Sequence, residues 1–190
     1  MIVYETEKEI ELLEKEIFEK KAKLIELKKT VPQQQVENYH FLNSNNSTVT
    51  LLDLFGESDE LMIIHNMGQS CSYCTMWADG FSGVYHHIKR KAPFYLSSPD
   101  VPEVQTRVAM ERGWTFPMIS TKENTFKKDL GFEKDGVKYP GVSTFRKDSQ
   151  NNIYHVAKSI FGPGDDFCSV WPLIELLPSG SEGYKPVKDL

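Results

Sequence analysis

The sequence predicts an α/β domain in which helices and a central mixed sheet form a three-layer sandwich. Two observations lead to this prediction. Apolar segments typical of strands alternate with amphipathic helical segments between residues 61 and 120, and two further strand-like segments lie between residues 142 and 160. Alternation requires crossover connections and a largely parallel central sheet, whereas the terminal hairpin should supply antiparallel edge strands.

Composition supports one folded core. The chain has 190 residues, of which 39% are hydrophobic and 26% are charged, an ordinary balance for a globular domain. The net charge of -5, with each lysine pair close to acidic residues, argues against partners that are nucleic acids or membrane surfaces. No apolar run approaches the roughly 20 residues of a membrane span.

The cysteine count bears on the cellular compartment. There are three cysteines, two of them only three residues apart, which is a poor framework for stapling a secreted fold. The acidic N-terminus also lacks the basic and apolar regions of a signal peptide. We therefore expect a reducing compartment, the cytoplasm.

A long amphipathic helix is predicted at the start of the chain. Residues 4–30 contain no glycine or proline, and the predicted helix ends before Pro32. Its apolar stripe consists of Ile10, Leu13, Ile17, Leu24 and Leu27. This stripe either packs on its own domain or forms a homodimer, which the near-heptad spacing permits; Lys20 interrupts the seam and favours the first interpretation.

We expect the chain to divide into three regions. Residues 1–36 form the N-terminal helical extension, residues 37–178 form the domain, and residues 179–190 form a flexible C-terminal tail. The tail is expected to be loose because Pro178, Gly180 and Gly183 lie in or beside it.

Within the domain, the first elements are a peripheral strand, polar turn and strand over residues 39–52, followed by a short helical turn at 53–56. Residues 61–65 form a continuous apolar run, which indicates a central strand buried on both faces. Ser70 is a candidate N-cap for a helix over 71–91, where Cys74, Trp77 and Phe81 have helical spacing. Further segments are predicted as a strand at 93–98, a helix at 101–112, a strand at 116–120 and a hairpin turning at 148–152.

The chemistry centres on the motif Cys71-Ser72-Tyr73-Cys74 at the predicted helix start. A thiolate attacks a disulfide, and the free N–H groups and partial positive charge of a helix N-terminus favour the thiolate. Cys71 is therefore the candidate nucleophile. Cys74, one turn further along the same face, is the candidate resolving cysteine.

Other interpretations of the motif stay open. A zinc-binding module would need ligands from His65, His86, His87 or Cys168 to converge on Cys71 and Cys74, because the chain has no second CxxC motif. The cysteines could also be small buried residues of a non-catalytic interaction protein. Our leading prediction includes no metal and no cofactor.

Two side chains near the motif are candidates for tuning it or for contacting a partner. His65 ends the central strand and could adjust Cys71 or transfer protons. Tyr73, between the cysteines, is expected to face a partner, whereas Trp77 has the spacing of a core residue.

Several segments together resemble a known family. They are Tyr39-His40-Phe41, Leu51 to Phe55, residues 61–65, the CxxC motif, Arg112 to Pro117 and Gly141 to Asp148. In this order the sequence resembles the domain-of-unknown-function family 899 over about residues 9–180. Members are bacterial thioredoxin-like proteins, distantly similar to peroxiredoxins and labelled dithiol-disulfide oxidoreductases.

The resemblance implies a thioredoxin-like fold and a thiol–disulfide oxidoreductase. Its substrate would be a disulfide-containing protein or a small-molecule thiol, in a site shaped by Trp114 and the 140–145 segment, including Val142 and Ser143. Val142 stands where thioredoxins have a cis-proline, which disfavours general protein reductase activity. Gly68 stands where peroxiredoxins have a threonine before the reactive cysteine, which disfavours a peroxidase of the usual type.

Overall fold

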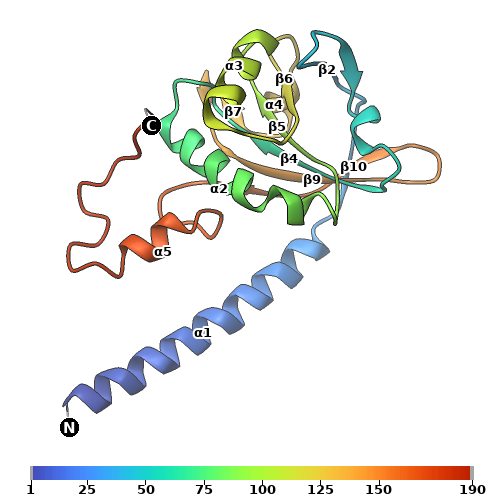
Figure 1. The fold of residues 1–190 in the computed structure, drawn as a ribbon. Helices are drawn as coiled ribbons and strands as arrows, with labels where there is room; N and C mark the ends of the chain where they lie inside the picture. The colour runs from blue at the N-terminus through green and yellow to red at the C-terminus, as the bar shows by residue number, and fades with distance from the viewer. Residues whose placement is uncertain (1, 189–190) are drawn as a thin grey trace.

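A computed structural model describes residues 2–188 and places the chain around one eight-stranded mixed sheet (Figure 1). The elements are α1 (Ile2–Thr30), β1 (Gln34–Val36), β2 (His40–Asn43), β3 (Thr48–Thr50), the 3₁₀ turn η1 (Asp53–Phe55), β4 (Glu60–His65), α2 (Ser72–Ile88), β5 (Phe94–Ser98), α3 (Pro102–Arg112), β6 (Met118–Ser120), α4 (Phe126–Asp129), β7 (Glu133–Lys134), β8 (Val137–Lys138), β9 (Gly141–Lys147), β10 (Ile153–Ile160) and α5 (Val170–Ile174). The strand order of the large sheet is β1-β10-β9-β4-β5-β6-β2-β3.

The centre of the sheet is the predicted apolar strand β4. It pairs in parallel with β5 and antiparallel with β9, so that Ile64 lies beside Leu96 on one side and beside Val142 on the other. The strand has a neighbouring strand on each side and packed side chains on each face, which explains its continuous apolar sequence. The predicted alternation of strands and helices from residue 61 to residue 120 is confirmed.

Two apolar clusters cover the two faces of the sheet. On one face, α2 and α3 pack over a cluster that includes Ile64, Trp77 and Phe94. On the other face, η1 and α4 contribute to a cluster that includes Ile63, Phe126 and Phe132. Side chains of consecutive strand residues point to opposite faces, so Ile63 and Ile64 belong to different clusters. The predicted α/β arrangement with a mixed central sheet is thus confirmed.

The position of the late hairpin differs from the prediction. Strands β9 and β10 pair as expected, but β9 also pairs with β4 and β10 also pairs with β1, so the hairpin lies within the sheet instead of at its edge. The edge strand β1 is short and polar, with Gln34 and Gln35 both exposed. Such a segment carries no hydrophobic alternation from which a strand could be predicted.

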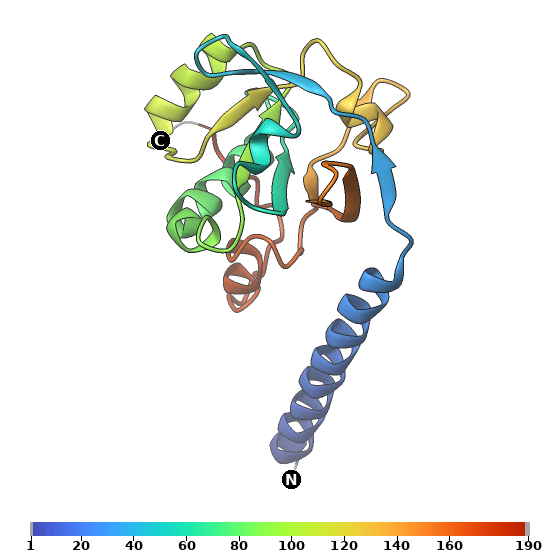
Figure 2. The same cartoon turned by 90° about the vertical axis from the view of Figure 1, so that its right-hand side faces the viewer.

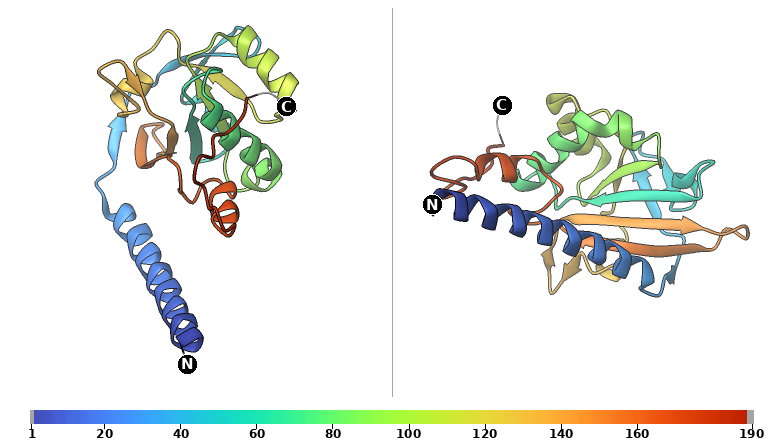
Figure 3. Two further views of the ribbon diagram at one scale, coloured as in Figure 1. Left: turned by 90° about the vertical axis from the view of Figure 1, so that its left-hand side faces the viewer. Right: turned by 90° about the horizontal axis from the view of Figure 1, so that it is seen from below.

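Outside the domain core, α1 extends away from the sheet and reaches well beyond it (Figure 2). The views in Figure 3 show the C-terminal segment running back past α5 toward the body. There Tyr184 packs edge-on against Trp171, and the Lys188 carbonyl accepts a hydrogen bond from Arg112 at 2.9 Å. The boundaries at residues 36 and 178 stay predictions. No helix within residues 2–188 is both long enough and apolar enough to cross a membrane.

Candidate active site

The loop from Asn66 to Ser70 connects the end of β4 to the start of α2 and is held by several hydrogen bonds. The Asn66 side chain accepts the Gly68 N–H at 2.7 Å, and the Asp100 carboxylate accepts the Gln69 N–H at 2.8 Å. Gly68 has a φ of +111°, a conformation that side-chain-bearing residues rarely adopt. This loop places the start of α2 at the carboxyl ends of β4 and β5.

Cys71 is the N-cap of α2, and its own sulfur performs the capping. Its Sγ accepts the backbone N–H of Cys74 at 3.0 Å, and its carbonyl accepts the N–H of Thr75 at 3.1 Å. The predicted cap, Ser70, is therefore wrong by one residue. A capping sulfur faces the unpaired N–H groups and the positive end of the helix dipole, where negative charge is stabilised.

The surroundings of Cys71 favour its thiolate. Its pKa is lowered to about 7, first by the hydrogen bond from the Cys74 thiol and then by the backbone N–H groups of Cys74 and Tyr73. Partial burial opposes this effect. A substantial fraction of Cys71 is therefore ionised at neutral pH, and the side chain is only half-buried.

Cys74 has the opposite character. It is 3% exposed, and its Sγ accepts the Met67 N–H at 3.4 Å. Its pKa is raised, first because its proton is engaged with the Cys71 sulfur and second because of burial. The pair therefore combines a half-buried thiol whose pKa is lowered with a buried thiol whose pKa is raised.

This asymmetry predicts the pH dependence of alkylation. We expect Cys71 to react with iodoacetamide with a half-maximal rate constant near pH 7, as measured by mass spectrometry of the reduced protein. Cys74→Ala removes the largest cause of the lowered pKa and should shift this midpoint upward, whereas Cys74→Ser keeps a hydroxyl donor and should shift it less. A midpoint above pH 8 in the wild-type protein would contradict this assignment.

A buried lysine lies beside the cysteine loop. Lys127 on α4 is 4% exposed, and its Nζ donates to the carbonyl of Asn66 at 2.9 Å and to that of Ser97 at 3.5 Å. Burial lowers its pKa to about 7, and a Cys74 thiolate would favour its charged form. In return, the Lys127 cation acts to lower the pKa of Cys74. Sequence reasoning missed this residue because the Lys127-Lys128 pair has the pattern of a solvated surface.

Three of the predicted substrate residues lie on the face of the sheet that α2 covers. Tyr73 stacks on Trp171 with ring centroids 6.1 Å apart, and half-buried Val142 packs in the same cluster. Trp114 is buried, and its indole N–H donates to Asp79 at 2.8 Å. These positions are compatible with a site around α2, and the substrate-binding role of each side chain stays a prediction.

His65 and Ser143 face the other side of the sheet. The Ser143 hydroxyl lies between two imidazoles, 3.0 Å from His65 Nε2 and 3.1 Å from His155 Nε2. The His65 ring stacks on Phe132 at 3.6 Å between centroids, and burial lowers its pKa well below the usual value. His65 is therefore neutral at physiological pH, and its ring lies on the face of the sheet opposite to α2.

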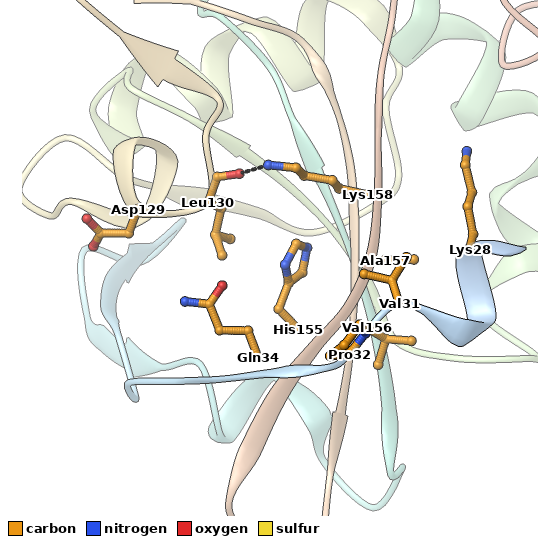
Figure 4. A pocket seen from close by; sticks show the side chains of 10 residues that line it. All are labelled: Lys28, Val31, Pro32, Gln34, Asp129, Leu130, His155, Val156, Ala157 and Lys158. Carbon is orange, nitrogen blue, oxygen red and sulfur yellow. Dashed lines mark hydrogen bonds between the residues drawn. The ribbon is translucent and has the colours of Figure 1, made fainter.

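His155, the more exposed of the two histidines that contact Ser143, lines a pocket of about 290 Å³ next to the end of α1 (Figure 4). Lys28, Val31 and Lys158 line the same pocket, and Lys158 donates to the Leu130 carbonyl at 2.7 Å. This pocket is separate from the cysteines. The redox site predicted at the start of α2 stays a prediction.

The zinc alternative requires further ligands close to Cys71 and Cys74. Within residues 2–188, no group of three or more histidine, cysteine or acidic side chains is arranged to hold a metal ion. All three cysteines are free thiols. Cys168 is buried near Phe81 and Trp171 in the α2-side cluster, where burial raises its pKa.

The fold, with a cysteine pair at the start of the helix that follows the central strand, defines a thioredoxin-like protein. The chain belongs to the bacterial protein family of unknown function DUF899, whose sequence profile matches residues 4–188. The comparison with curated proteins finds no match.

Solved structures with a similar fold include peroxiredoxins. A cysteine-to-serine variant of peroxiredoxin Q from Xylella fastidiosa is 18% identical, with a TM-score of 0.54 over 67% of this chain and 84% of that chain. The peroxidoxin BcpB from Mycobacterium tuberculosis is 15% identical, with a TM-score of 0.52 over the same shares. At this identity the likeness shows the fold, and the predicted thioredoxin-like class is confirmed.

Proposed function

We propose that this protein is a thiol–disulfide oxidoreductase in which Cys71 is the nucleophile and Cys74 is the resolving cysteine. The observation that carries the proposal is the capping geometry of Cys71. One half-buried sulfur accepts a backbone N–H at the helix start and has a pKa near neutrality, while its partner three residues later is buried and protonated. This is the division of roles that disulfide exchange requires.

The exchange runs in two steps. In the first, the Cys71 thiolate attacks one sulfur of a substrate disulfide, forms a mixed disulfide and releases the other substrate sulfur as a thiolate. In the second, Cys74 loses its proton and attacks the Cys71 sulfur, which releases the second substrate thiolate. The products are a Cys71–Cys74 disulfide and a substrate reduced by two electrons. A dithiol or two low-molecular-weight thiols return these electrons to the enzyme.

Lys127 is placed to assist the second step by accepting the proton of Cys74. Cys74 has to ionise inside the protein, where burial disfavours a thiolate. A neutral lysine with two N–H groups on the Asn66 and Ser97 carbonyls keeps a lone pair for a proton, and the resulting ammonium is a counter-charge for the thiolate. A pKa near 7 suits both roles at neutral pH.

The apolar side chains beside the start of α2 favour substrates that bring an apolar group next to the disulfide. Tyr73 and Val142 both pack against the cluster on the α2 side of the sheet. Such a substrate is a disulfide-containing protein segment or a small-molecule disulfide. Gly68, three residues before Cys71, offers no hydroxyl for a peroxide, so we propose a disulfide as the oxidant in place of a peroxide.

A redox titration tests the proposal. The full chain is equilibrated in glutathione or dithiothreitol buffers of known potential, free thiols are alkylated, and the state of Cys71 and Cys74 is read by mass spectrometry. We expect a reversible two-electron transition between about -120 and -270 mV, the span of known dithiol oxidoreductases. If no Cys71–Cys74 disulfide forms at any potential, the proposal is wrong.

A further inference from the structure

The helix α1 presents an apolar surface with little to cover it. Its contacts with the domain include a salt bridge between Lys21 and Asp166 at 2.6 Å and a hydrogen bond from Lys28 to Ser159 at 3.4 Å. Figures 1 and 2 show its N-terminal part well away from the sheet. Large apolar side chains at least half exposed are Tyr4, Ile10, Leu12, Leu13, Ile17, Phe18, Leu24, Ile25 and Leu27. Most of the stability of a helix in a protein comes from packing of its apolar face. We therefore expect another protein surface to cover the apolar face of α1.

The apolar stripe has the spacing of a coiled-coil seam. Counting Ile10 as position a, the stripe places Ile17 and Leu24 at a, and Leu13 and Leu27 at d, over three consecutive heptads. Lys20 occupies the remaining d position. Its ammonium pairs with Glu16 at 2.6 Å on the same helix, so its aliphatic stem can lie along the seam while the charge stays at the edge.

The charges beside the seam are divided between the two halves of the helix. Positions e and g flank the seam and set the orientation of a pair of helices. In the first half they carry Glu7, Glu9, Glu14 and Glu16, and in the second half they carry Lys21, Lys23, Lys28 and Thr30. One half of the flank is therefore acidic and the other is basic.

We propose that α1 pairs in an antiparallel coiled coil with α1 of a second copy of this chain. In this arrangement the seam layers are Ile10 with Leu27, Leu13 with Leu24, and Ile17 with Lys20, each occurring twice by symmetry. The flanking contacts join opposite charges. They are Glu7 with Lys28, Glu14 with Lys21, and Glu16 with Lys23.

A parallel pair would bring like charges together. Position g of one helix would then face position e of the next heptad on the other helix. This places Glu9 against Glu14 and Lys23 against Lys28, and only Glu16 with Lys21 remains favourable. Like-charge contacts destabilise by about as much as opposite-charge contacts stabilise, so the charge pattern selects the antiparallel pair.

A single charge reversal distinguishes the two orientations. Sedimentation equilibrium of the full chain in a reducing buffer gives the dimer dissociation constant. We expect Glu14→Lys to weaken the dimer about tenfold, because two symmetry-related contacts with Lys21 become repulsive. Adding Lys21→Glu should restore the wild-type constant. Strengthening by Glu14→Lys would indicate a parallel pair and overturn the proposal.

Two controls complete the experiment. Glu11→Lys makes the same change of charge at position b, outside the seam and its flanks, and should leave the constant within about twofold of wild type. Leu13→Glu with Leu24→Glu should give a monomer whose domain unfolds at the wild-type temperature, since both side chains are exposed in the single chain. A wild-type protein that is monomeric up to about 100 µM would refute the proposal, as would a dimer that survives the double leucine variant.

Discussion

Cys71→Ser should reduce the rate of exchange with a small disulfide, such as hydroxyethyl disulfide, to the uncatalysed level, a loss of about 10³-fold or more. A serine hydroxyl at the same N-cap position does not ionise near neutral pH, so the helix start has no anion to stabilise. Cys74→Ser should instead slow the first step only slightly, because the serine hydroxyl can still donate a hydrogen bond to Cys71. Since no resolving thiol follows, the substrate should stay attached to Cys71, and mass spectrometry should show one stable adduct.

A third variant controls for general damage to the protein. Cys168→Ala removes the remaining cysteine, which is buried next to α5. Burial raises the pKa of this thiol, so we expect exchange to continue at the wild-type rate in the variant. Circular dichroism of all three variants checks that each is folded. If Cys71→Ser kept its activity while Cys168→Ala lost it, the nucleophile would have been assigned to the wrong cysteine.

The parts of this site that follow from local sequence are those that could be predicted. The continuous apolar run from Leu61 to His65 predicts a buried strand. The spacing of Cys74, Trp77 and Phe81 predicts one face of a helix. The sequence predicts Ser70 as the cap because serine is among the usual capping residues. The structure uses Cys71 instead, and a capping sulfur is also a stabilised thiolate, so the deviation from the usual rule coincides with the chemistry.

Other parts depend on contacts between distant segments. A strand buried on both faces does not reveal which of its side chains face the site. The sequence therefore could not show that Ile64 points toward α2 while His65 points away. The short elements α4, β7 and β8 have too few residues for a periodic pattern. Lys127 reaches the site only because α4 brings it to the carbonyls at the ends of β4 and β5.

Lys127→Met should slow the resolving step by about 100-fold, the scale of a lost proton-transfer group, without changing the rate of alkylation of Cys71 at pH 8. The mixed disulfide would then accumulate during turnover and decay slowly. Lys128→Met is the matched control, because Lys128 is the adjacent residue but is exposed. Equal resolution rates in the Lys127→Met variant and the wild-type protein would show that Cys74 ionises without help from this lysine.

The free energies of unfolding of the wild-type protein and of Lys127→Met test the role of Lys127 without an activity measurement. The native pKa of Lys127 is about 7, below the unfolded value near 10.4, so above pH 7 the unfolded chain binds a proton that the native protein has lost. The free energy of unfolding therefore rises with pH, and this group contributes about 2 kcal/mol between roughly pH 7 and pH 8.5. Cys71 adds to the rise with the same sign, since its native pKa is also lowered, but it does so in both proteins. Urea unfolding at these two pH values should thus show a smaller rise for Lys127→Met than for the wild-type protein. An identical rise would mean that Lys127 stays charged in the folded protein, where it could act as a fixed counter-charge to Cys74 but not as the acceptor of its proton.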